Sequence, residues 1–195
     1  MVLYGTIPSI VVIHSHASLE IFIFLFFPCH VVLHTNVFLS RYFAELTKGV
    51  LSRLEQSKGH NSAAEMRLSI YGMEQGEWLN LAKWILRDWD GPFPGPVLST
   101  HNRWIIQVPR LWRIYCMKGK NEVTKGSFED MLKNLFCPIF EATLYPEQHP
   151  EIAELLTHIV AFDSVDDEGT LEAPCNCARP SAWKNEQNPA YCWQL

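Results

Sequence analysis

Charge is almost absent from the amino-terminal end of this chain. No lysine or arginine precedes Arg41, and Glu20 is the single carboxylate between Val2 and Leu39. A secretory signal peptide needs a positively charged start before its apolar run, so none is expected here. The six cysteines are widely spread along the chain, apart from Cys175 and Cys177. Together these features predict a cytosolic protein with reduced thiols.

A strongly basic surface is lacking as well. The formal net charge is -5, and charges of both signs are scattered through residues 41–188, which argues against a nucleic-acid partner. The short cluster of Lys118, Lys120 and Lys125 is interpreted as a solvated loop. With 195 residues, the chain is also shorter than the roughly 250 residues of a complete (β/α) barrel.

What the chain does contain is an alternation of strand patterns and helix patterns. Strands are expected near residues 65–71, 103–108 and 159–164, and helices over residues 41–56, 77–87, 128–136 and 150–159. The alternation predicts an α/β fold with adjacent parallel strands, as part of a (β/α) barrel or of a doubly wound sheet. In the first strand, one side should carry Met66, Leu68 and Ile70, and the other Arg67, Ser69 and Tyr71.

Acidic residues gather at the end of the third strand pattern and directly after it. They are Asp163, Asp166, Asp167 and Glu168. Because barrel enzymes place function at the carboxyl ends of their strands, these residues are candidates for substrate contact, and the alternative is a hydrogen-bonded loop. Arg110 follows the second strand, where its guanidinium could reach an anionic substrate or pair with a carboxylate such as Glu65 or Asp163.

Eight sequence blocks, taken together and in order, carry a family resemblance. They are Phe43-Ala-Glu-Leu-Thr-Lys48, Leu54-Glu-Gln-Ser-Lys58, Ala64-Glu-Met-Arg-Leu-Ser-Ile-Tyr-Gly72, Glu77-Trp78 with Leu81-Ala-Lys-Trp84, Trp104-Ile-Ile-Gln-Val-Pro-Arg-Leu111, Ser127-Phe-Glu-Asp-Met-Leu132, Pro138-Ile-Phe-Glu-Ala-Thr143 and Asp163-Ser-Val-Asp-Asp-Glu168. The likeness continues through residues 180–183 and Asn188-Pro-Ala-Tyr191. On these blocks the chain resembles AMP deaminase over roughly residues 37–193.

The resemblance implies a zinc aminohydrolase built on a (β/α) barrel, which converts AMP to IMP and ammonia with a zinc-activated water. It also implies that the zinc ligands and proton-transfer residues lie outside the matched blocks, one His-x-His pair upstream and the others downstream. Residues 36–195 would then be a partial catalytic domain with about three of the eight parallel strands. We therefore assign the chain no catalytic residue and no metal ligand, and we leave its substrate-binding residues unassigned. Zinc and AMP are expected to bind the full-length enzyme, a possible homo-oligomer.

Residues 1–35 stand outside the resemblance. From Ile7 to Leu33 the chain is apolar and long enough to span a bilayer. Against a membrane anchor stand the absence of flanking positive charge and the polar or helix-breaking residues within the stretch, which are His14, His16, Glu20, Pro28 and His30. The alternatives are a buried strand and an atypical start joined to a genuine deaminase fragment.

Two short motifs resemble metal ligand pairs. His14-Ser-His16 would place two imidazoles on one face of a strand, which is how this superfamily holds its metal. The pair lies much closer to Phe43 than the family's pair does, so we interpret it as a coincidence. Cys175-Asn-Cys177 has no second pair at ligand spacing and is interpreted as part of a variable loop.

Two functions from different classes follow from the sequence. In the first, the chain is AMP deaminase sequence that is active as part of a longer polypeptide. In the second, it is a catalytically inactive remnant whose helices pack against a full-length subunit, as an interaction module. Under both, the isolated chain is expected to release no ammonia from AMP and to hold no zinc.

Overall fold

The computed structural model describes residues 9–11, 23–25, 37–56, 63–109 and 128–165. Two short strands, β1 (Ser9–Val11) and β2 (Ile23–Leu25), pair antiparallel. The main sheet contains β3 (Ala64–Ser69), β4 (Asn102–Pro109) and β5 (Ile159–Val165). The described helices are α2 (Val37–Gln56), α3 (Glu77–Leu86), α5 (Phe128–Leu144) and α6 (Pro150–Thr157).

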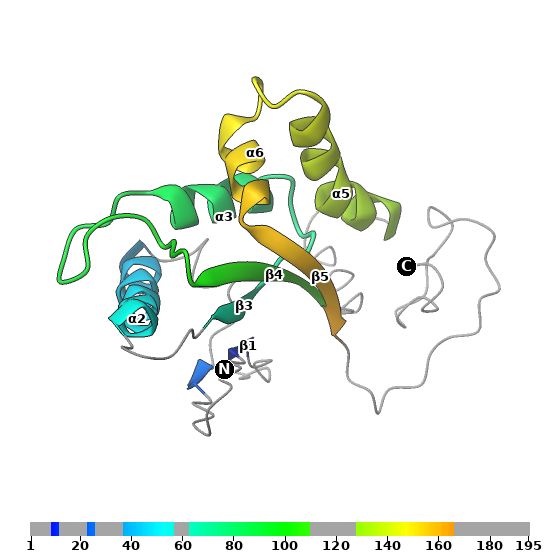
Figure 1. Ribbon diagram of the computed structural model, residues 1–195. Coiled ribbons are helices and arrows are strands. Elements are labelled where there is room, and N and C mark those ends of the chain that lie inside the picture. Colours follow the sequence, from blue (N-terminus) through cyan, green and yellow to red (C-terminus); the bar gives the residue numbers. More distant parts are fainter. Residues whose placement is uncertain (1–8, 12–22, 26–36, 57–62, 110–127, 166–195) are drawn as a thin grey trace.

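The main sheet is parallel, with its strands in the order β3-β4-β5 (Figure 1). This arrangement confirms the predicted α/β class and the prediction of three adjacent parallel strands. Helices α3, α5 and α6 lie together on one side of the sheet (Figure 1). The strands and helices are compatible with part of a (β/α) barrel. Because the strands run in one direction, their carboxyl ends meet at the same edge.

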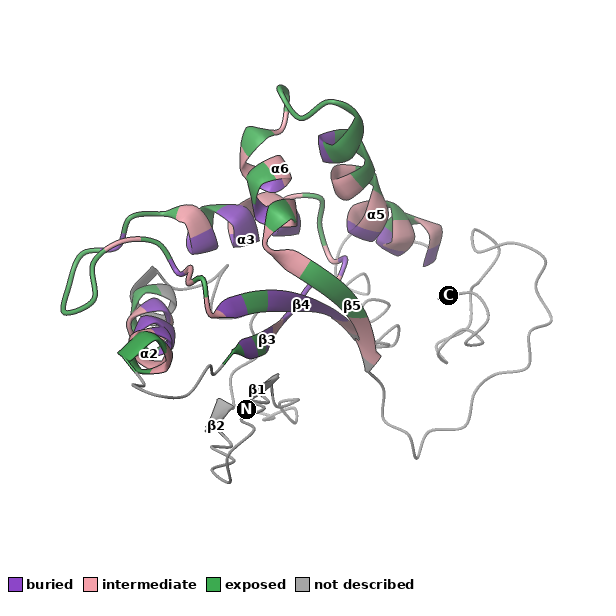
Figure 2. Ribbon diagram, in the orientation of Figure 1, coloured by how far each residue is buried: buried purple, intermediate pink, exposed green. Residues whose placement is uncertain are grey.

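The two faces of the sheet differ in polarity because side chains alternate along each strand. On one face, Met66 and Leu68 are at most 3% exposed. Leu68 pairs with Ile106, which pairs with Phe162, and Phe162 contacts Trp78 of α3, so this face meets the helices. Figure 2 shows buried positions on β3 and β4 and on the helices above them. The polar residues of β3 lie on the opposite face, as predicted.

The core between helices and sheet is built mainly from three helices. Helix α3 contributes Trp78, Leu81, Trp84 and Ile85, whose spacing places them on one side of the helix. Helices α5 and α6 add Phe128, Met131, Leu135, Ile152 and Leu155. These side chains pack on the apolar face of the sheet, so they fix the helices against β3 and β4.

Helix α5 is longer than the sequence pattern indicated. The predicted helix ended at residue 136, whereas α5 continues past Pro138 to Leu144. A proline inside a helix removes one backbone hydrogen bond and crowds the preceding turn. Because α5 has buried residues on both sides of Pro138, packing offsets this loss. The helix predicted over 150–159 ends early, at Thr157, because the chain there turns into β5.

Helix α2 buries most of the face that its larger apolar residues predict, with one exception. The expected buried face contained Phe43, Leu46, Val50, Leu51 and Leu54. The prediction is wrong for Leu46, which is 40% exposed. The buried residues are Ala44, Thr47, Lys48 and Leu51. Phe43 stacks on Trp84 of α3 with ring centroids 5.2 Å apart, and Phe43, Val50 and Leu54 are half-buried against the core.

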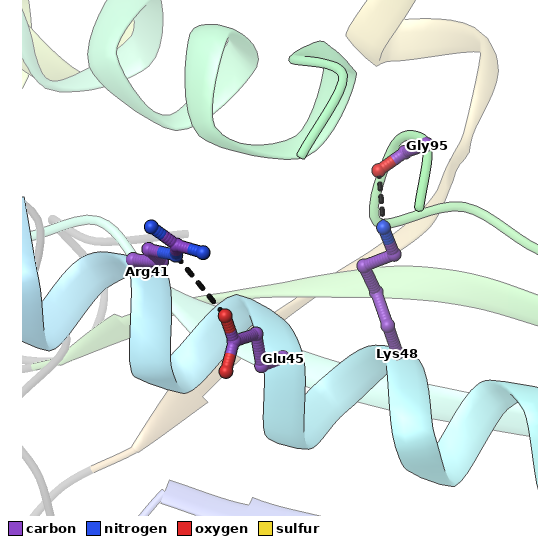
Figure 3. A network of polar contacts seen from close by, with 4 residues as sticks. All are labelled: Arg41, Glu45, Lys48 and Gly95. Atoms are coloured by element: carbon purple, nitrogen blue, oxygen red, sulfur yellow. Dashed lines mark hydrogen bonds and ion pairs between the residues drawn. The ribbon is translucent and has the colours of Figure 1, made fainter. Parts of the chain in front are cut away.

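Lys48 ties α2 to the proline-rich loop between α3 and β4. It is 5% exposed, and its ammonium donates a hydrogen bond to the carbonyl oxygen of Gly95 (Figure 3). Burial lowers the pKa of Lys48, and the nearby carboxylates of Asp88 and Glu45 oppose that shift. Glu45 also accepts a hydrogen bond from Arg41, one helical turn earlier, over 3.1 Å. The loop is therefore anchored to α2 by a buried cation.

The amino-terminal stretch from Ile7 to Leu33 is described in part, as β1 and β2. Strand β1 contacts β3 of the main sheet. Within the described ranges, no helix combines the length and the apolar character that crossing a bilayer requires. The three interpretations of residues 1–35 stay predictions.

Candidate functional site

The candidate site lies on the face of the sheet opposite α3, α5 and α6, toward the carboxyl ends of the strands. Strand register places Ser69, Gln107 and Asp163 side by side, one on each strand. Arg67 lies on the same face of β3, two residues before Ser69. We call these four residues the strand-end cluster. Parallel α/β sheets bind their ligands beyond the carboxyl ends of their strands.

An ion pair crosses the sheet within the strand-end cluster. Arg67 Nε donates to Asp163 Oδ2 over 3.0 Å, which links β3 to β5 across β4. The two side chains are 25% and 36% exposed, so solvent reaches the pair. Ser69 Oγ donates a long hydrogen bond of 3.5 Å to Gln107 Oε1, and both of these residues are buried. The cluster thus presents a guanidinium, a carboxylate and an amide on one face.

The sequence pattern identified one member of this cluster as a candidate. Asp163 was expected to contact substrate or to pair with a cation, and the structure pairs it with Arg67, a partner that the sequence did not suggest. Three further groups of candidates lie outside the described residues. They are Arg110, Asp166, Asp167 and Glu168; Lys118, Lys120 and Lys125; and the pairs His14 with His16 and Cys175 with Cys177.

A buried carboxylate in the first turn of α3, on the helix side of the sheet, is a feature beside the site that sequence reasoning missed. Glu77 is 3% exposed and accepts hydrogen bonds from three successive backbone N–H groups. Its Oε2 accepts from Tyr71 and Gly72 over 2.7 and 2.9 Å, and its Oε1 accepts from Met73 over 2.7 Å. We call this arrangement the Glu77 clamp. The sequence feature that could have indicated this role is the position of Glu77, an acidic residue in the first turn of a helix that follows a strand.

The loop held by the Glu77 clamp is also attached to α5. Asn134 Nδ2 donates to the carbonyl oxygen of Gly72 over 2.9 Å. Trp78 Nε1 donates to the carbonyl oxygen of Leu135 over 2.8 Å, so α3 and α5 are joined beside the loop. The indole of Trp78 meets the ring of Phe162 edge-on, directly before Asp163 in β5. The clamp and the strand-end cluster therefore lie on opposite faces of the sheet and approach each other at the adjacent residues Phe162 and Asp163 of β5.

The residues described by the structure do not form a zinc site. Among them, no three His, Cys, Asp or Glu side chains are placed to share a metal ion. His149 and His158 lie near one glutamate each, Glu141 at 3.8 Å and Glu154 at 3.4 Å. A catalytic zinc needs three protein ligands around an open position. The described residues thus do not fit the metal that the sequence resemblance implies.

Replacing Arg67 with Met or Asp163 with Asn should lower the free energy of unfolding by about 1 kcal/mol each, because the pair is partly exposed and screened by water. A double-mutant cycle measured by urea unfolding should give a coupling energy of roughly 0.5–1 kcal/mol. The control is the pair of Arg41, which is 54% exposed, and Glu45, for which the coupling should stay below about 0.5 kcal/mol. A zero coupling between Arg67 and Asp163 would contradict this prediction and show that the ion pair does not stabilise the sheet.

The fold and the site together define a class of protein. Parallel strands, helices packed on one face and polar side chains near the strand ends characterise α/β proteins with a ligand site at the carboxyl edge. The family model for AMP deaminase matches residues 30–195. The chain is 38% identical over 168 residues to AMP deaminase of Saccharomyces cerevisiae, and 39% identical over 162 residues to AMP deaminase of Dictyostelium discoideum. The chain belongs to the AMP deaminase family.

The match covers most of this chain and a small part of each relative. AMP deaminase 3 of Homo sapiens is 40% identical over 157 residues. The three alignments cover 85%, 82% and 79% of this chain, but 19% of each relative. The chain therefore spans about one fifth of the length of the relatives that it matches. The family membership confirms the resemblance carried by the sequence blocks.

Proposed function

We propose that this chain is a segment of an AMP deaminase, an enzyme that converts AMP to IMP and ammonia. The membership in that family carries the proposal. In it, residues 36–195 belong to the catalytic domain and supply β3, β4 and β5 to a (β/α) barrel. The enzyme as a whole uses a zinc-activated water, and the zinc ligands come from outside the described residues of this chain.

The position of the strand-end cluster supports this assignment. Barrel enzymes bind their substrates at the carboxyl ends of the strands, which is the edge that the cluster approaches. The ion pair with Asp163 holds the guanidinium of Arg67 in one orientation, and Gln107 adds an amide on the neighbouring strand. A nucleotide offers ring nitrogens and phosphate oxygens that such groups recognise. In the proposal these residues line the wall of the substrate cavity and transfer no proton themselves.

A graft tests the proposal. Residues 30–195 of this chain replace the matching segment of AMP deaminase from Saccharomyces cerevisiae. The graft should convert AMP to IMP with a kcat/KM within about a hundredfold of the parent enzyme, because the rest of the active site is unchanged. The isolated chain, assayed alongside, should release no ammonia. A graft that folds and binds zinc but makes no IMP would contradict the proposal and favour the interaction module.

A further inference from the structure

We infer that Glu77 is a positioning residue, which holds the loop of Tyr71, Gly72 and Met73 in one geometry at the substrate edge of the sheet. This inference rests on the proposed function. The loop leaves the end of β3, so its backbone lies at the edge where a parallel sheet receives its ligand. Glu77 is set behind the loop, in the first turn of α3. Its effect on a substrate would pass through the loop backbone.

The hydrogen bonds of the Glu77 clamp explain how the loop is fixed. Both carboxylate oxygens are used, and the three donors lie on consecutive residues at 2.7 to 2.9 Å. Charge-assisted hydrogen bonds of this length are strong, and successive amides that converge on an anion form a backbone nest. Because Glu77 is 3% exposed, movement of the loop would leave a buried carboxylate without these donors. The loop therefore stays in place because moving it would cost the free energy of leaving a buried carboxylate without hydrogen-bond donors.

The clamp is coupled to the strand-end cluster through packed contacts. Gly72 is held from the other side by Asn134 of α5. Trp78, next to Glu77 in the chain, contacts Phe162, and the following residue of β5 is Asp163. A displaced loop would therefore disturb both the edge of β3 and the partner of Arg67. The expected consequence for an enzyme is misplaced substrate with unchanged proton chemistry.

Amide hydrogen exchange in the full chain tests the clamp directly. Glu77→Gln keeps the size of the side chain but has one oxygen, so its NH2 group must face at least one of the three backbone donors. Exchange at residues 71–73 should become about tenfold faster or more, as for a local opening. The control is Glu129→Gln, which removes an acidic residue from the first turn of α5, where the side chain is 42% exposed. It should leave residues 71–73 unchanged.

A second variant keeps this test decisive if Glu77→Gln is poorly folded. Glu77→Ala removes the carboxylate and leaves space behind the loop, which sodium formate should fill. Formate should restore slow exchange at residues 71–73, whereas sodium chloride at the same ionic strength should not. Unchanged exchange in Glu77→Gln, or equal effects of formate and chloride on Glu77→Ala, would overturn the clamp.

Kinetics of the Saccharomyces cerevisiae graft test the positioning role. Glu77→Gln should lower kcat/KM for AMP by about tenfold to a hundredfold, with an unchanged pH profile, because loop geometry changes and no proton donor is lost. A shifted pH profile would assign Glu77 a direct chemical role instead. Faster amide exchange with unchanged kinetics would overturn the positioning role. A graft that is inactive with Glu77 intact would overturn the proposed function and this role with it, while the exchange data would still report on the clamp.

Discussion

Trp78→Ala should lower the free energy of unfolding by about 3–5 kcal/mol, a large part of the stability of a typical domain. Trp78 is 1% exposed, and its indole Nε1 donates to the carbonyl oxygen of Leu135 over 2.8 Å. Its ring also lies against Phe162, with centroids 6.2 Å apart. The substitution would open a cavity where α3, α5 and β5 meet and would remove the donor to a buried carbonyl. Urea unfolding followed by circular dichroism measures the change.

Two matched variants separate the contributions at this position. Trp78→Phe keeps an aromatic ring but loses the hydrogen bond to Leu135, so it should cost about 1–3 kcal/mol. Phe140→Ala, at a residue that is 62% exposed on α5, should change stability by less than about 0.5 kcal/mol. If Trp78→Ala lowered the free energy of unfolding as little as Phe140→Ala, the packing of α3 against the sheet described above would be contradicted.

Gly72→Ala should destabilise the chain by about 2–4 kcal/mol. The backbone φ of Gly72 is 70°, a region that residues with a side chain rarely adopt. A Cβ atom there would come within 2.8 Å of both Leu135 Cγ and the backbone oxygen of Met131. Because the second contact is with the backbone of α5, it cannot be relieved by a side-chain rotation. Thermal unfolding should show a clearly lower midpoint.

Gly76→Ala is the matched control for this substitution. Gly76 precedes α3 with φ of -77°, and a Cβ there would find its nearest neighbour, Asn80 Nδ2, at 3.6 Å. Alanine is compatible with this backbone, so stability should be unchanged or rise by up to about 1 kcal/mol. Equal losses for Gly72→Ala and Gly76→Ala would show that the tight approach of the loop to α5 does not exist.

The strands could be predicted from the sequence because their signals are local. The alternation of Met66, Leu68 and Ile70 with polar residues marks β3, and an apolar run that turns acidic marks β5. Their neighbouring order follows because consecutive strand and helix units pack side by side. The extent of α5 and the exposure of Leu46 on α2 could not be predicted, because tertiary packing outweighs the effect of Pro138 and the apolar character of Leu46.

In the candidate site, Asp163 alone could be predicted from the sequence, because its position after an apolar run marks it. Asp163 follows the apolar first half of β5, so its place near the carboxyl end of that strand was expected. Its pairing with Arg67 depends on the register between β3 and β5, which no local pattern encodes. Glu77 looked like an ordinary acidic residue at a helix start. Its three backbone donors converge only because the loop turns at Gly72 with positive φ.

Whether this chain is catalytic-domain sequence of an AMP deaminase is measured most directly by the rate of AMP-dependent ammonia release in three proteins. They are the Saccharomyces cerevisiae AMP deaminase, the graft that carries residues 30–195 of this chain, and the same enzyme with the matching segment deleted. We predict activity in the parent and in the graft, and none in the deletion, because the barrel cannot close without these strands. A folded graft as inactive as the deletion would contradict the assignment.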